Sequence, residues 1–60
     1  MPAIWIHIDN DGIVQGASVA AYTEPRMLQE WKERGGKVEL IEADAVTLGQ
    51  SLPPETRIIR

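Results

Sequence analysis

The sequence predicts a small α+β domain, in which a β-hairpin and a third strand form a sheet, one helix packs on one face of that sheet, and an irregular C-terminal arm ends the chain. Three observations predict it: alternating apolar residues over 3–8, turn residues over 10–12, and a helical apolar stripe over 25–34 that ends at a glycine pair. Because sixty residues suffice for one domain, we expect residues 1–60 to form a single unit.

The first strand is expected over residues 3–8, because three isoleucines alternate with Trp5 and His7. The isoleucines then lie on one face of the sheet, and Trp5 and His7 lie on the other. We expect the single helix to pack on the isoleucine face, since one helix covers one face of a sheet.

Asn10-Asp11-Gly12 provides the turn of the hairpin, because Gly12 can adopt a positive φ and Asn or Asp side chains can bond nearby backbone N–H groups. A second strand follows over Ile13–Ser18. We prefer a three-residue loop with a left-handed Gly12 to a two-residue Asp11-Gly12 turn, since it places Val14 on the isoleucine face. This register pairs Ile8 with Val14, Ile6 with Gly16, and Trp5 with Ala17.

The helix is expected over Pro25–Arg34, where Met27, Leu28 and Trp31 share one face. Its N-cap is either Thr23 or Glu24, and Gly35-Gly36 ends it.

A third strand is expected over Lys37–Glu42, with Val38 and Leu40 on one face and Glu39 and Ile41 on the other. Residues 43–50 fit either a short helix capped by Asp44 or a strand. Pro53-Pro54 favours extended backbone, and Thr56–Ile59 reads as a short edge strand or an ordered tail.

Composition excludes several kinds of site. The chain has no cysteine, so it forms no disulfide and no cysteine-based metal site, and its single histidine cannot form a two-histidine site within one chain. A net charge of −3 disfavours a nucleic-acid partner. Neither a signal peptide nor an apolar run of membrane-spanning length is visible, so we expect a cytoplasmic protein without membrane contact. No cofactor is expected.

The apolar strand that ends in Asp9-Asn10-Asp11-Gly12 resembles the first motif of the haloacid-dehalogenase-like phosphatases. The helix, glycines and strand over residues 28–38 continue the resemblance. It implies a parallel sheet, with Asp9 as nucleophile, Asp11 as acid/base and Mg²⁺ as cofactor. Where the family has its second motif, this chain has Glu42-Ala43-Asp44. We favour the simpler interpretation that these residues form a hairpin turn, and therefore expect no enzyme and no catalytic residue.

The face with Trp5, His7 and Ile41 needs a cover if the helix occupies the opposite face. Exposed tryptophan beside aliphatic residues is typical of an interaction site. We therefore expect a non-enzymatic interaction module that binds another protein or, as a homodimer, a second copy, with Trp5, His7 and Ile41 in the interface. The alternative is that the chain's own segment over residues 48–59 covers this face.

Overall fold

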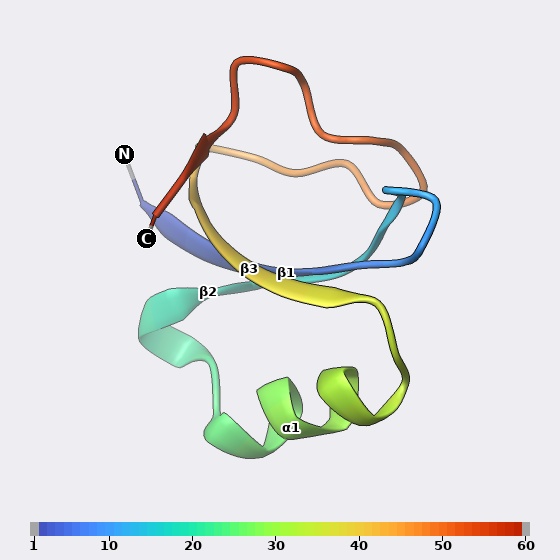
Figure 1. Cartoon of the computed structure of the whole chain (residues 1–60). Helices are drawn as coiled ribbons and strands as arrows, with labels where there is room; N and C mark the ends of the chain where they lie inside the picture. Colours follow the sequence, from blue (N-terminus) through green and yellow to red (C-terminus); the bar gives the residue numbers. More distant parts are fainter. Residues whose placement is uncertain (1, 60) are drawn as a thin grey trace.

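A computed structural model describes residues 2–59 and shows an α+β fold (Figure 1). Within these residues, a four-stranded sheet has the order β2-β1-β3-β4, and every neighbouring pair is antiparallel. The elements are β1 (Ala3–Ile8), β2 (Val14–Val19), the 3₁₀ helix η1 (Ala20–Tyr22), α1 (Pro25–Glu33), β3 (Lys37–Glu42) and β4 (Arg57–Ile58). The sheet lies between α1 on one side and the C-terminal arm, residues 43–56, on the other (Figure 1).

The predicted hairpin turn is confirmed. The Asp9 N–H donates to the Ile13 carbonyl at 3.0 Å, and the Gly12 N–H donates to the Asp9 carbonyl at 3.1 Å. Gly12 has a φ of 82°, so it takes the left-handed position of a three-residue loop. Val14 consequently lies opposite Ile8, as the sequence predicted.

The rest of the predicted register is wrong by one residue. His7 lies opposite Gly16, Ile6 opposite Ala17, and Trp5 opposite Ser18. The shift falls between His7 and Ile8, where β2 contains an extra residue, Gln15, that has no partner in β1. Such a β-bulge inserts one unpaired residue, and it shifts every later residue of the strand by one relative to its partner.

The helix packs on the face of Trp5 and His7, not on the isoleucine face, so this prediction is wrong. Trp31 is buried and stacks on His7. A Cβ atom on Gly16 would lie 3.1 Å from Cζ2 of Trp31. The missing side chain of Gly16 therefore gives the indole a place directly against the sheet, which the isoleucine face does not offer.

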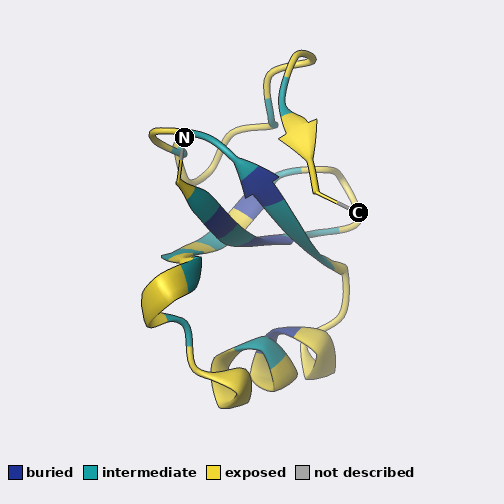
Figure 2. Ribbon diagram, turned by 90° about the vertical axis from the view of Figure 1, so that its left-hand side faces the viewer, coloured by how far each residue is buried: buried dark blue, intermediate teal, exposed yellow. Residues whose placement is uncertain are grey.

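The C-terminal arm covers the isoleucine face. Ile4, Ile6, Val14 and Ile41 form the buried cluster there, and partly buried arm residues, Ala43, Val46 and Leu52, pack against it. The predicted grouping of Ile41 with Trp5 and His7 is wrong, because Ile41 lies opposite Ile4 in the register of β1 and β3 and shares its face. Figure 2 shows the buried residues concentrated in the central strands.

Residues 43–50 form neither of the two predicted elements but an irregular loop with a turn over 48–49. Backbone contacts to β2 hold its end: the Gly49 N–H donates to the Val14 carbonyl at 2.9 Å, and the Val14 N–H donates to the Gln50 carbonyl at 3.0 Å. The predicted edge strand is present as β4, in which Ile58 pairs with Ile41.

The helix begins as predicted with Pro25 in its first turn, so the N-cap position belongs to Glu24. Thr23, the alternative cap, uses its hydroxyl elsewhere: Oγ1 lies 2.8 Å from the Val19 carbonyl and 2.7 Å from the Ser18 hydroxyl. The helix ends at Glu33, one residue before the predicted end, and Gly35 and Gly36 follow with φ values of 90° and 80°.

Candidate functional site

The three residues expected in an interface do not form one exposed surface. His7 is 6% exposed and Ile41 is fully buried, while Trp5 is half-buried on the helix side of the sheet. His7 and Ile41 lie on opposite faces, under α1 and the C-terminal arm respectively. The face that was expected to need a partner is therefore covered within the chain.

His7 connects the sheet to the segment that follows α1. Its Nε2 lies 2.6 Å from the Gly35 carbonyl oxygen. Because a carbonyl oxygen only accepts, Nε2 carries the proton and donates it. The imidazole also stacks on Trp31. These contacts give His7 a structural role at the junction of β1, α1 and the start of β3.

The Asp9 carboxylate organises the hairpin turn. Its Oδ1 accepts hydrogen bonds from the N–H groups of Asp11 and Ile13, both at 2.9 Å, and its Oδ2 accepts one from Nε2 of Gln15 at 2.7 Å. The bond from the Ile13 N–H is the main reason that the pKa of Asp9 lies below its ordinary value, against a smaller opposing effect of burial.

These bonds bear on the resemblance to the phosphatases. Asp9 uses both carboxylate oxygens within the turn, while Asp11 is exposed. The strand before the motif belongs to an antiparallel sheet, whereas the resemblance implied a parallel one. The geometry of Asp9 is that of a turn-forming side chain.

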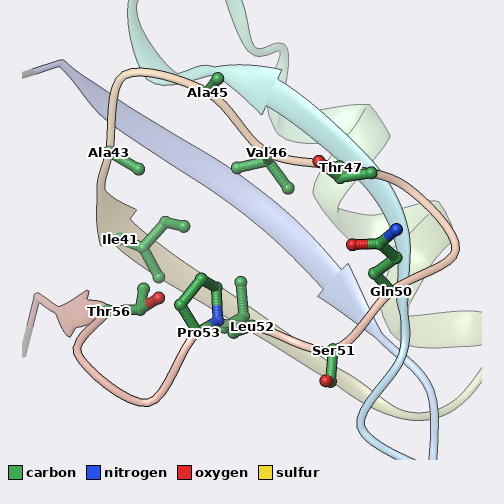
Figure 3. A pocket seen from close by; sticks show the side chains of 10 residues that line it. All are labelled: Ile41, Ala43, Ala45, Val46, Thr47, Gln50, Ser51, Leu52, Pro53 and Thr56. Carbon is green, nitrogen blue, oxygen red and sulfur yellow. The ribbon is translucent and has the colours of Figure 1, made fainter.

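Two hollows flank the C-terminal arm. A cavity of about 150 Å³ lies between the arm and the sheet, and Figure 3 shows Ile41, Val46 and Leu52 around it. Its lining includes no acidic or basic side chain. A shallower groove of about 440 Å³ lies beside the hairpin turn. Lys37 and Glu39 line it together with the apolar residues Ile8 and Ile58. The lining of the groove also includes Asp9 and Ser51, and both carboxylate oxygens of Asp9 accept hydrogen bonds within the turn.

The remaining candidate is an edge of the sheet. We call residues 12–23 the uncharged edge, because this stretch contains none of the six basic and nine acidic residues of the chain. It includes β2, one of the two outer strands of the sheet, and η1. Two of its large side chains are exposed, Val19 at 45% and Tyr22 at 84%.

Sequence reasoning missed this edge, although the missing charges are visible in the sequence. Charge depletion together with exposed aromatic and aliphatic side chains is typical of the centre of a protein interface. What the sequence did not reveal is that β2 lies at the border of the sheet, since a hairpin strand can equally lie inside one.

Within residues 2–59, no group of three or more histidine, aspartate or glutamate side chains could hold a metal ion. Over the same residues, no helix has the length and apolar character needed to cross a membrane.

Comparison of the chain with protein-family models, with curated proteins and with solved structures finds no match.

Proposed function

We propose that this protein is a non-enzymatic interaction module that self-associates into a homodimer through the uncharged edge, residues 12–23. The observation that carries the proposal is the coincidence of two features: β2 is an outer strand, and the segment that contains it, residues 12–23, has no charged residue. The interface thus differs from the one expected from the sequence at Trp5, His7 and Ile41.

Edge strands of soluble monomers are commonly protected against pairing. Lysine, proline or inward-pointing charges on the strand, or a covering segment, provide the protection. β2 has the sequence VQGASV, which contains no charge and no proline. The C-terminal arm reaches β2 at Ile13 and Val14. Among residues 2–59, the backbone of residues 16–18 pairs only with β1.

The charge distribution favours a second copy as the partner. Two copies with a net charge of −3 repel each other at most orientations. The uncharged edge contributes no carboxylate of its own to such a contact, and the Asp9 carboxylate beside it accepts a hydrogen bond from Gln15. A 60-residue chain also gains from added burial, because a domain of this size buries only roughly 60% of its unfolded surface.

A matched pair of lysine substitutions tests the proposal. Ala17 is an exposed residue of β2, and Ala45 is an exposed residue of the C-terminal arm. Both Ala17→Lys and Ala45→Lys add one positive charge. We expect wild type and Ala45→Lys to be dimers in analytical ultracentrifugation, with melting temperatures that rise with protein concentration. Ala17→Lys should be a folded monomer, because two lysines would meet across the interface.

Wild-type protein that remains monomeric at its highest soluble concentration would overturn the proposal. Equal dimerisation of the two lysine variants would instead place the interface away from β2, which also contradicts it.

A further inference from the structure

We infer that the dimer forms by antiparallel pairing of β2 with β2 of the second copy, centred on Ala17, so that one sheet continues through both copies. This inference rests on the proposed self-association and specifies its geometry. It requires that the backbone groups of Ala17 point away from β1, and that the strand around Ala17 is accessible.

The direction of the backbone groups follows from the ladder. The N–H and C=O of Val14 bind Gln50 and Gly49 of the C-terminal arm, so they point away from β1. Hydrogen-bonded and non-hydrogen-bonded pairs alternate along an antiparallel ladder. Val14 opposite Ile8 is thus a non-hydrogen-bonded pair.

Continuing the alternation past the bulge, the next pair, Gly16 with His7, is hydrogen-bonded, and the pair after it, Ala17 with Ile6, is not. The N–H and C=O of Ala17 therefore point outward, whereas those of Ser18, opposite Trp5, point toward β1.

A second strand is blocked at both ends of β2 but not at its centre, where Ala17 lies. The C-terminal arm contacts the outer side of β2 at Ile13 and Val14. At the other end, η1 begins at Ala20. Ala17 lies near the middle of the interval between them. Its neighbours Gly16 and Ser18 have small side chains, which allow a second strand to approach closely.

A twofold axis at Ala17 completes the geometry. In an antiparallel pair of identical strands, Ala17 faces its own equivalent, and each Ala17 donates one hydrogen bond and accepts one. Gly16 then faces Ser18, and Gln15 faces Val19, so no charged pair arises. The arrangement is a closed twofold dimer, in which the same surface is used by both copies.

Amide hydrogen exchange measured by NMR tests the pairing in the wild-type protein. The Ser18 N–H, bonded within the sheet, should be protected at all concentrations. The Ala17 N–H should exchange fast in dilute solution. Its exchange rate should fall by about tenfold or more as the fraction of dimer rises with protein concentration. Ala17→Pro provides a second test, because proline removes only an outward donor and is tolerated on edge strands. We expect this variant to be a folded monomer, with Ala45→Pro as the dimeric control.

The outcomes separate the two proposals. A dimer in which the Ala17 N–H stays unprotected refutes strand pairing at Ala17 but leaves self-association standing. A monomeric wild type refutes both. If Ala17→Pro does not fold, the exchange of the wild-type Ala17 N–H decides alone.

Discussion

The imidazole of His7 lies nearly parallel to the indole of Trp31, with ring centroids 5.9 Å apart and an angle of 9° between the planes. His7 belongs to β1 and Trp31 to α1, so this stack attaches the helix to one of the two central strands of the sheet. Gly16, which lies beside His7 on the neighbouring strand, keeps the space free for the indole. The position of the only α-helix among residues 2–59 thus depends on three residues from three elements.

Replacing His7 should loosen the helix. His7→Ala removes the stack on Trp31 and the hydrogen bond to the Gly35 carbonyl, and we expect it to lower the free energy of unfolding by about 2 kcal/mol. His7→Phe keeps a ring but loses the donor, so its effect should be smaller. Urea unfolding followed by tryptophan fluorescence measures both. A change below about 0.5 kcal/mol for His7→Ala would show that the stack contributes little.

Two glycines with similar backbone angles should respond differently to alanine. Gly12 has a φ of 82° and open space around it, so Gly12→Ala should cost about 1 kcal/mol, the strain of a left-handed alanine. Gly36 has a φ of 80°, but a Cβ atom there would collide with the Ile8 carbonyl. We expect Gly36→Ala to cost about 3 kcal/mol or more. Equal losses in chemical denaturation would show that the backbone at Ile8 moves aside easily.

The lowered pKa of Asp9 predicts a dependence of stability on pH. Because the folded state holds the carboxylate ionised, its contribution is present above the unfolded pKa and is lost as pH falls below about 4, through the folded pKa. Asp9→Asn lacks this titration. The difference in melting temperature between wild type and Asp9→Asn should be constant near neutral pH and change in acid.

Asp11→Asn is the matched control for that experiment, since Asp11 is exposed and lies two residues after Asp9 in the same turn. If Asp11→Asn alters the acid profile as strongly as Asp9→Asn, the hydrogen bonds to the Asp9 carboxylate are not its cause.

The sequence by itself determined the local elements of this protein. Alternation placed β1 at residues 3–8 and β3 at Lys37–Glu42, and the apolar stripe placed α1 at Pro25 with an end one residue from Glu33. Gly12 determined the turn, because few residues adopt its φ. Each of these features depends on neighbours along the chain, so its cause is readable from the sequence.

The tertiary structure alone decided which surface each element covers. Periodicity shows which residues of β1 share a face, but both faces carry large apolar side chains, so it does not show what packs on them. The unpaired Gln15 shifted the register and brought Gly16 beside His7, where the indole of Trp31 fits. The helix consequently took that face, and the C-terminal arm took the isoleucine face. The same strand order placed the uncharged edge at the border of the sheet, a position that depends on packing between distant segments.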